Sequence, residues 1–351
     1  MFARGSLGVL RAILALGLAL GLAGAACGPS AARDAGKARV SGTAATPATA
    51  AEAGRLRRLA AVKSWGYQLR LIRFPAIAAS SFDLVVIDHA LSAGRRFVHQ
   101  FAPELIEMAK RRPDGRRRIV LAYMSIGEAE RYRFYWDQAW YDPRHKPRWL
   151  GDINPVWDGN YLARFWDRDW QRIILEGPDS YLGRIMAAGF DGIYLDRADV
   201  HAEWAKERKS AEADMVRFIA RIGEAARARN PDFLVVMQNA EELLRHAFVV
   251  RAIDAVAKED LFFGVDHRQG RNDTDTVSWS LRYLRQAKRA GRQVFVVEYL
   301  DDARHMREVE ARLRKDDFVA HFTARDLGDL ADLAERPAAP GIAPAGPPGT
   351  R

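Results

Sequence analysis

Short apolar runs that alternate with amphipathic stretches constrain the fold of this 351-residue chain more than any other feature. An apolar run of strand length followed by a stretch of helical period is typical of a buried parallel strand and the helix that covers it. The pattern therefore predicts an α/β fold built on a parallel sheet. The eight runs cover residues 66–69, 84–88, 119–124, 192–196, 234–239, 255–259, 294–299 and 318–323.

The stretches between these runs carry signals for the ends of helices. Asn230-Pro231 ends a helix, because the residue before a proline disfavours helical geometry, and Gly189 and Gly291 stand where a helix is expected to end. Eight strand-and-helix units in about 270 residues match a (β/α)8 TIM barrel. A doubly wound open sheet remains the rival fold, because counting strands does not establish closure. The main helical candidates cover 103–111, 168–175, 204–229, 241–252, 276–290 and 303–314.

The first 26 residues have the pattern of a bacterial secretory signal peptide. Arg4 and Arg11 flank a segment without acids, and residues 12–22 are an uninterrupted run of Ala, Ile, Leu and Gly. Small residues at 23–26 then precede Cys27, which resembles the lipobox of bacterial lipoproteins, although Gly24 stands where leucine is usual. We expect Cys27 to be lipidated and the protein to be exported to the cell envelope, or outside the cell. Ordinary signal cleavage near residue 26 is the alternative.

Composition sets the expected domain boundaries. Residues 27–62, rich in Ala, Gly, Thr and Ser, are expected to form a flexible linker, and 336–351, rich in Pro, Ala and Gly, a disordered tail. The single folded domain is expected to cover 63–335, and we expect it to be a monomer. Because Cys27 is the only cysteine, disulfides and all-thiolate metal sites within the chain are excluded.

The net charge of +9 does not belong to the expected barrel. Residues 1–65 hold nine Lys and Arg against two acids, and 336–351 hold two more bases and no acid. Residues 66–335 carry 43 bases and 43 acids, so their net charge is zero. This balance gives little support for a nucleic-acid partner, whereas a basic signal and linker suit an anionic membrane surface.

Five of the eight runs end on a carboxylate or amide side chain. In a barrel these ends meet at the face that carries the active site. Acids and amides that cap the next helix are the plain alternative, but Glu and Gln are poor caps. Two carboxylates, Asp196 and Glu259, end the fourth and sixth runs and so lie across one mouth. Such a pair can hydrolyse a glycosidic bond, with one general acid and one nucleophile or base. The five side chains are Asp88, Asp196, Asn239, Glu259 and Glu298, the last of which stands directly before Tyr299 at the end of its run.

An aromatic-rich insertion separates the third and fourth strands. Aromatic faces stack on sugar rings, which suits a carbohydrate groove. Packing of the insertion onto the barrel rim explains the same residues, because large aromatics also dominate ordinary cores. We expect one or two of them to contact ligand. Six of the nine tryptophans lie in this insertion: Trp136, Trp140, Trp149, Trp157, Trp166 and Trp170.

Several other chemistries lack their motifs. The sequence contains no Gly-x-Gly-x-x-Gly, Walker or Gly-x-Ser-x-Gly motif, which argues against nucleotide-dependent and serine-hydrolase chemistry. The histidines show no recognisable metal-ligand spacing. We expect neither a metal nor an organic cofactor.

Taken in order, seven segments make the chain resemble glycoside hydrolase family 114, the endo-α-1,4-polygalactosaminidase-like barrels. The resemblance runs from about residue 64 to 330. The segments are Trp65-Gly66-Tyr67-Gln68-Leu69, Leu84-Val85-Val86-Ile87-Asp88, Ala122-Tyr123-Met124-Ser125-Ile126-Gly127-Glu128, Trp149-Leu150-Gly151, Gly189-Phe190-Asp191-Gly192-Ile193-Tyr194-Leu195-Asp196, Met237-Gln238-Asn239 and Lys258-Glu259-Asp260-Leu261-Phe262.

The resemblance implies roles for particular positions. It implies that Asp196 and Glu259 are the catalytic carboxylates, with Glu259 the general acid. The seventh strand departs from the family pattern, because Glu298 stands where we expect aspartate. Residues that match positions around the family's sugar-binding cleft are Tyr67, Asp88, Tyr123, Glu128, Gln238, Asn239, Glu298 and Tyr299.

The expected function is therefore a secreted glycoside hydrolase that acts on an amino-sugar polysaccharide of the α-1,4-galactosamine type. A cluster of acids suits such a substrate, because a protonated amino sugar is attracted to carboxylates. A barrel that binds cell-surface polysaccharide without cleaving it is the alternative. The expected partners are the polysaccharide and, through lipidated Cys27, a membrane.

Overall fold

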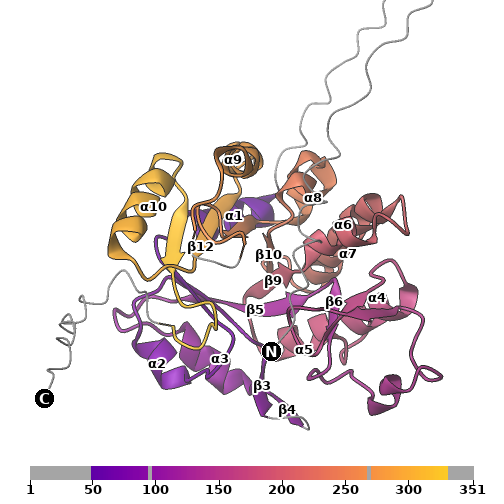
Figure 1. The fold of residues 1–351 in the computed structure, drawn as a ribbon. Helices are drawn as coiled ribbons and strands as arrows, with labels where there is room; N and C mark the ends of the chain where they lie inside the picture. Colours follow the sequence, from indigo (N-terminus) through magenta and orange to yellow (C-terminus); the bar gives the residue numbers. More distant parts are fainter. Residues whose placement is uncertain (1–48, 94–96, 267–269, 331–351) are drawn as a thin grey trace, which may run out of the picture. The chain divides into compact units, whose positions relative to one another are not determined.

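The computed structural model describes residues 49–93, 97–266 and 270–330 (Figure 1). The expected signal peptide, Cys27 and the tail at 336–351 lie outside the described residues. Among the described helices, none combines the length and the apolar character that crossing a bilayer requires.

Eight parallel strands follow one another around the sheet in the order in which they occur in the sequence. A doubly wound sheet reverses its order at a switch point, so the sequential order excludes the rival fold. The strands are β1 (Trp65–Gln68), β2 (Leu84–Ile87), β5 (Ile119–Ser125), β9 (Gly192–Asp196), β10 (Leu234–Gln238), β11 (Ala255–Glu259), β12 (Gln293–Glu298) and β13 (Val319–Phe322).

The barrel closes through side chains and a loop where its first and last strands meet. Seven strand pairs share a parallel ladder, but the described pairings include none between β1 and β13. Instead, the Trp65 indole N–H donates to the Val319 carbonyl at 3.1 Å, and the Tyr67 backbone N–H donates to His321 Nε2 at 3.3 Å. The backbone N–H of Leu69 also donates to the Leu327 carbonyl, at 3.0 Å. The sheet is therefore a nearly closed (β/α)8 barrel, as predicted.

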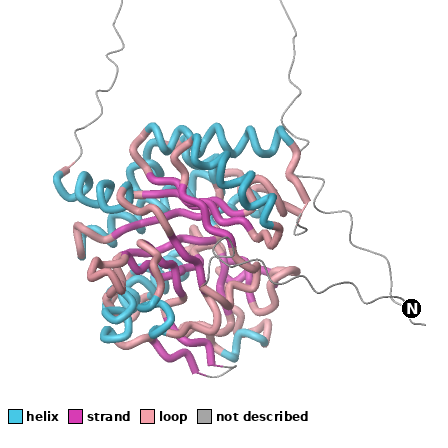
Figure 2. Tube along the Cα trace, turned by 90° about the vertical axis from the view of Figure 1, so that its left-hand side faces the viewer, coloured by secondary structure: helices cyan, strands magenta, loops and turns pink. Residues whose placement is uncertain are grey.

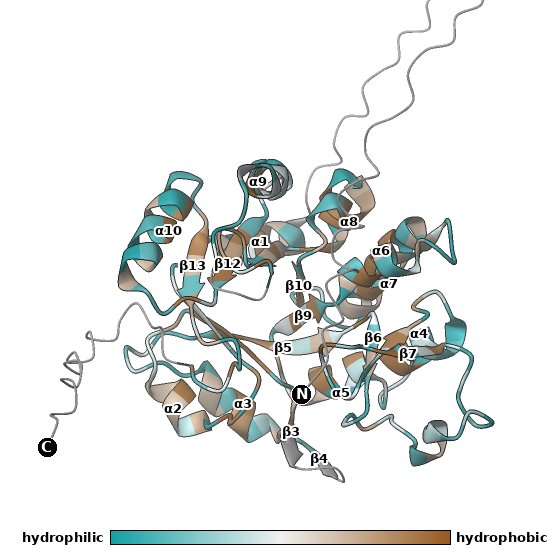
Figure 3. Ribbon diagram, in the orientation of Figure 1, coloured by the Kyte–Doolittle hydropathy of each residue, from teal (hydrophilic) through white to brown (hydrophobic). Residues whose placement is uncertain are grey.

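Helices surround the strands (Figure 2). The buried apolar side chains form two separate clusters. Because neighbouring residues of a strand point to opposite faces, one set of side chains fills the barrel and the other packs against the helices. Figure 3 shows hydrophobic residues along the strands and on parts of the surrounding helices. The helices are α1 (Ala50–Ala60), α2 (Phe74–Ala79), α3 (Pro103–Lys110), α4 (Arg168–Leu175), α5 (Tyr181–Ala187), α6 (His201–Trp204), α7 (Ala211–Arg229), α8 (Ala247–Ala252), α9 (Thr274–Arg289) and α10 (Ala303–Lys315), with short 3₁₀ turns η1 (Gln138–Tyr141), η2 (Ala198–Val200) and η3 (Glu241–Arg245).

Helix α1 corrects the expected linker at 27–62. Thr49 caps the helix by accepting the backbone N–H of Glu52, and Leu59 is fully buried in the cluster that fills the barrel. Arg55, also buried, donates through Nε to Asp254 at 2.9 Å. Small residues and arginines suggested a tether, but alanine and arginine are also strong helix formers, and a single apolar stripe is enough for docking. The folded unit therefore begins near Ala48.

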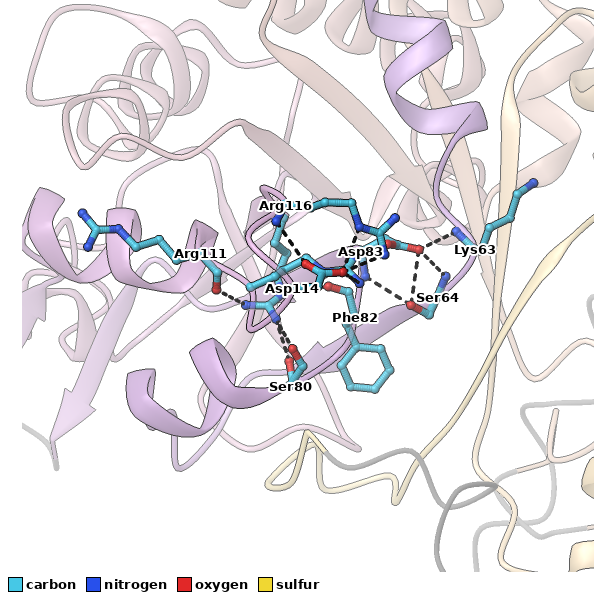
Figure 4. A network of polar contacts seen from close by, with 10 residues as sticks. Lys63, Ser64, Ser80, Phe82, Asp83, Arg111, Asp114 and Arg116 are labelled. Carbon is cyan, nitrogen blue, oxygen red and sulfur yellow. Dashed lines mark hydrogen bonds and ion pairs between the residues drawn. The ribbon is translucent and has the colours of Figure 1, made fainter.

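Polar contacts also hold the opening turns of the barrel. Asp83, just before β2, accepts the backbone N–H groups of Lys63 and Ser64 at 2.9 and 3.2 Å and pairs with Arg112 (Figure 4). Arg118 is buried and donates to the carbonyl of Phe82 at 2.9 Å. The last arginine of the 116–118 run is therefore a structural residue of the core, since its charge is satisfied by carbonyls.

The insertion between β5 and β9 contains a small antiparallel sheet that the strand pattern did not predict. It consists of β6 (Glu128–Glu130), β8 (Asn160–Ala163) and β7 (Leu150–Ile153) in that order. A second hairpin, β3 (Ala90–Ala93) with β4 (Phe97–Gln100), follows β2.

Most tryptophans of the insertion pack against one another. Trp140 meets Trp149 edge to face at 5.1 Å, and Trp149 lies 4.9 Å from Trp170, whose indole N–H donates to the Ile126 carbonyl at 2.8 Å. These contacts fit the packing interpretation. Trp157 differs, because it is half exposed.

Candidate active site

The candidate site lies at the carboxyl ends of the barrel strands, where side chains of one parity point inward. Along β9, Tyr194 belongs to the cluster inside the barrel, so Asp196, two residues further, continues the same face. Along β11, Ala257 places Glu259 on the same inner face. Strand β10 lies between them in the sheet. The structure thus brings the two predicted carboxylates to one mouth.

Asp196 receives two hydrogen bonds. The hydroxyl of Tyr123, from neighbouring β5, donates to Oδ2 at 2.7 Å, and the backbone N–H of Arg197 donates to Oδ1 at 2.7 Å. Both donors hold the side chain in a single orientation at the strand end.

Glu259 is held in a similar way from its other side. The hydroxyl of Tyr299, directly after β12, donates to Oε2 at 2.8 Å, and the Asn239 amide donates to Oε1 at 3.0 Å. Each carboxylate therefore has one phenol donor from an adjacent strand. The arrangement leaves both carboxylates oriented by residues predicted for the site.

The two carboxylates interact electrostatically. Burial raises the pKa of Asp196, the negative charge of Glu259 raises it further, and the Tyr123 hydrogen bond opposes these effects; the resulting pKa is about 7. Asp196 therefore keeps its proton up to near neutral pH, beside the negative charge of Glu259. Such a pair can supply an acid and a base at the same time.

Two buried tyrosines, Tyr67 and Tyr194, belong to the cluster inside the barrel near Asp196 and Glu259. The Tyr67 hydroxyl donates to Gln238 Oε1 at 3.4 Å, and its ring centroid lies 5.2 Å from that of Tyr194. Burial is the main cause that raises the pKa of both phenols, and the charges of Asp196 and Glu259 add to it. The buried Tyr194 hydroxyl makes no hydrogen bond to the described residues. Sequence reasoning did not include Tyr194 in the site, although its spacing of two residues from Asp196 places it on the same face.

Two other predicted residues occupy ion pairs at the rim. Burial favours the neutral acid at Asp88, but the Arg133 guanidinium at 2.6 Å and the His89 hydrogen bond outweigh it and lower the pKa to about 2. Glu128 is fully buried 2.9 Å from Arg197 Nε, and burial raises its pKa despite that cation. Their negative charges are thus largely compensated within the protein.

Glu298 points away from the barrel interior. Its carboxylate accepts the backbone N–H of Phe262 at 2.8 Å and that of Phe263 at 3.3 Å, so it holds the loop after β11. Burial raises its pKa to about 8, and nearby Asp260 contributes. Glu298 therefore contacts a loop rather than the mouth, which differs from its predicted place around the sugar-binding cleft.

The backbone is strained where strands β9, β10 and β11 end. The residues after Asp196, Gln238 and Glu259 all have positive φ angles without being glycine: Arg197 (62°), Asn239 (54°), Ala240 (49°) and Asp260 (53°). Such conformations concentrate at functional sites, where the surrounding structure maintains them. Here they turn the chain sharply, so that the final side chain of each strand stays at the mouth.

Arg325 is a further residue that the sequence did not indicate. It pairs with both oxygens of Asp260, at 2.9 and 2.8 Å, and its guanidinium lies 4.2 Å from the ring centroid of Tyr299. It therefore contacts the residue after Glu259 and the phenol bonded to Glu259. Arg325 lies in the loop after β13, where the sequence contains no recognisable motif that would have indicated it.

The described residues contain no group of three or more His, Cys, Asp or Glu side chains arranged to hold a metal ion. The side chains at the mouth are carboxylates, phenols and amides. A barrel with two interacting carboxylates at its carboxyl-end mouth has the architecture of a glycoside hydrolase.

Comparison with known proteins identifies the family. Residues 44–338 match the model of glycoside-hydrolase family GH114, and the chain belongs to this family. Uncharacterised proteins of Methanocaldococcus jannaschii and Thermotoga maritima are each 35% identical to it, over 73% and 68% of this chain and 71% of each relative. An uncharacterised protein of Deinococcus radiodurans is 32% identical over 78% of this chain and 83% of its own.

A solved structure supports the fold. The glycoside hydrolase domain of PelA from Pseudomonas aeruginosa superposes with a TM-score of 0.58 at 19% identity, covering 77% of this chain and 97% of that domain. The predicted family and the predicted barrel are both confirmed.

Proposed function

We propose that this glycoside hydrolase cleaves an amino-sugar polysaccharide of the α-1,4-galactosamine type, with Asp196 and Glu259 as the catalytic pair. The observation that carries the proposal is the electrostatic coupling of these two carboxylates, each oriented by a tyrosine at one barrel mouth. The substrate class rests on the family resemblance. The charge argument for an amino sugar now depends on the pair itself, because Asp88 and Glu128 are matched by arginines.

In the proposed reaction, one carboxyl group protonates the glycosidic oxygen as the bond to the anomeric carbon breaks. The other carboxylate attacks that carbon or activates the water that does so. The proton that Asp196 holds near neutral pH is available for the acid step, and the phenols of Tyr123 and Tyr299 keep both groups in place. Activity should therefore fall as the pH rises above about 7, where Asp196 loses its proton.

The roles of the two carboxylates require a separate test. The family pattern favours Glu259 as the acid, whereas the raised pKa of Asp196 favours the reverse. Loss of the acid is tolerated when the leaving group needs no proton, but loss of the nucleophile or base is not. Glu259→Gln should keep activity on a dinitrophenyl glycoside and lose it on the polymer, and Asp196→Asn should lose both. The opposite pattern would exchange the roles.

The substrate is tested with a panel of hexosamine polymers that differ in linkage and acetylation. We expect new reducing ends from the α-1,4-galactosamine polymer, and none after Asp196→Asn or Glu259→Gln. Wild-type turnover in both variants would refute the proposed mechanism. Affinity for the polymer without new reducing ends would select the non-catalytic binding barrel.

We also propose that the protein is exported and held at the cell envelope by lipidated Cys27. The proposal rests on the residue pattern of 1–27. Cells fed an acyl-chain probe should label the wild type and not Cys27→Ser. An unlabelled wild type would refute the anchor.

A further inference from the structure

The tip of the β7–β8 hairpin gathers exposed apolar side chains. Ten large apolar residues are exposed in the described part of the chain. Three of them lie in one five-residue stretch at this tip: Ile153 (48%), Val156 (62%) and Trp157 (50%). Single exposed apolar residues are ordinary, but a group of them marks an interaction surface. We call residues 153–159 the hairpin tip.

Hydrogen bonds hold the hairpin tip in one conformation. The Asn154 side-chain oxygen accepts the backbone N–H groups of Val156 and Trp157 at 2.8 and 3.1 Å. Arg131 donates its backbone N–H to the Gly159 carbonyl at 2.8 Å and pairs with Asp158 at 2.6 Å. A ligand that stacks on Trp157 would therefore meet a backbone that is already ordered, which lowers the entropic cost of binding.

The same hairpin is tied to the turn that follows Asp196. The amides of Asn154 and Asn160 donate to the two oxygens of buried Glu128 at 2.8 and 3.2 Å. Glu128 also pairs with Arg197, whose backbone N–H donates to Asp196. One buried carboxylate thus anchors both the hairpin and the catalytic strand end.

Close backbone approach reinforces this junction. A Cβ atom added to Gly127, the residue before Glu128, would lie 2.1 Å from the Arg197 carbonyl oxygen. The connection from β5 to β6 therefore lies directly against the turn after Asp196. The hairpin tip is consequently part of the barrel rim on the Asp196 side of the mouth.

We propose that Trp157 forms a sugar-stacking subsite for a unit of the polysaccharide remote from the cleaved bond, on the Asp196 side of the mouth. This inference rests on the proposed function and extends it to a second contact with the polymer. The apolar face of a pyranose ring packs on an indole, as other flat apolar groups do. An amino sugar would add a cation–π attraction, since its ammonium can lie over the same ring.

The test compares Trp157→Ala with Trp279→Ala. Trp279, on α9, is 42% exposed and makes an edge contact with Tyr283, so it serves as a matched exposed tryptophan outside the proposed subsite. In Trp157→Ala, the ratio of kcat/KM on the galactosamine polymer to kcat/KM on an aryl disaccharide should fall about three- to tenfold. Trp157→Phe should restore most of this ratio, and Trp279→Ala should leave it unchanged.

Binding is measured separately from turnover by retardation of the Glu259→Gln protein in gels that contain the polymer. Weaker retardation after Trp157→Ala supports the subsite. If the wild type binds the polymer in this way but does not hydrolyse it, the subsite stands and only the proposed hydrolysis is refuted. Hydrolysis and retardation that are indifferent to Trp157 overturn the subsite and leave the proposed function standing. Absence of both binding and hydrolysis overturns both. Trp157-dependent adsorption to phosphatidylglycerol vesicles, with unchanged polymer retardation, assigns the tip to a lipid surface and also overturns the subsite.

Discussion

At the scale of single residues, strand parity separates the groups that can meet substrate from those that cannot. Asp196 and Glu259 share the inner face with buried barrel residues, whereas Glu298 lies on the outer face and binds loop amides. Parity is readable from the sequence, so the position of Glu298 was predictable. The ion pairs of Asp88 and Glu128 were not, because Arg133 and Arg197 come from an insertion and a turn whose paths the sequence pattern does not determine.

The raised pKa of Asp196 predicts a pH-dependent cost in stability. The native state holds this proton more tightly than the unfolded chain, whose aspartate has a pKa near 3.8, so stability falls as pH rises from about 4 to about 7. Asp196→Asn removes that cost. We expect the variant to be close to the wild type at pH 4 and to exceed it at pH 8 by up to about 4 kcal/mol. Thermal unfolding at both pH values measures this; a difference that is the same at both would contradict the assignment.

Arg325 is predicted to act as a positioning residue for the Tyr299–Glu259 contact. Arg325→Gln removes the cation over the Tyr299 ring and the pair with Asp260, so the hydrogen bond to Glu259 should weaken. Loss of one hydrogen bond to a charged group corresponds to about a ten- to hundredfold decrease in kcat, with KM nearly unchanged. Arg325→Lys should recover part of the activity.

A matched control for Arg325 exists in the neighbouring loop. Arg271 lies over the Phe263 ring at 4.9 Å and pairs with Glu308 at 2.6 Å, without contact to either proposed catalytic carboxylate. Arg271→Gln should keep the wild-type pH profile. If both variants lose activity equally, the effect belongs to the loop and not to Tyr299.

At the scale of elements, the strands follow from the sequence far better than the helices around them. Buried strands are recognisable as short runs of β-branched and aliphatic residues. Strands β9 and β11 have the predicted bounds. The long helical candidates are less accurate. The stretch 204–229 was predicted as one helix, but it contains the end of α6 and, after a turn, α7. Helix α1 was missed because its burial depends on partners nearly 200 residues away, such as Asp254.

Helix α1 is predicted to be part of the folded unit. A chain that starts at Ala48 keeps Leu59 and Arg55, whereas one that starts at Lys63 loses a buried leucine and leaves Asp254 with fewer partners. Losing a buried leucine alone costs about 2–5 kcal/mol. We expect the shorter chain to unfold at clearly lower temperature or to aggregate, as calorimetry would measure. Equal melting temperatures would restore the linker interpretation.

At the scale of the whole molecule, the corrected boundary changes the charge of the folded unit only slightly. Residues 48–335 hold 47 bases and 44 acids. Two of the added arginines face acids, Arg55 at Asp254 and Arg58 at Asp191. The number of charged residues can be read from the sequence, but which arginine pairs with which acid cannot.

This charge balance predicts negligible affinity for nucleic acid. The chain from Ala48 onward should not bind a labelled DNA duplex at about 200 mM salt, and binding at about 50 mM should be weak. Fluorescence anisotropy across this salt range is the measurement. A steep decrease in affinity with salt would reveal a basic face that the net charge conceals.

The side-chain closure between β1 and β13 has a consequence for how the chain becomes a barrel. The first strand offers one of its edges to a strand that is synthesised some 250 residues later, so that edge stays without its final neighbour until almost the entire domain has emerged. The indole of Trp65 and the ring of His321 then join the first and the last strands of the barrel. The barrel therefore cannot close until its last strand has been synthesised.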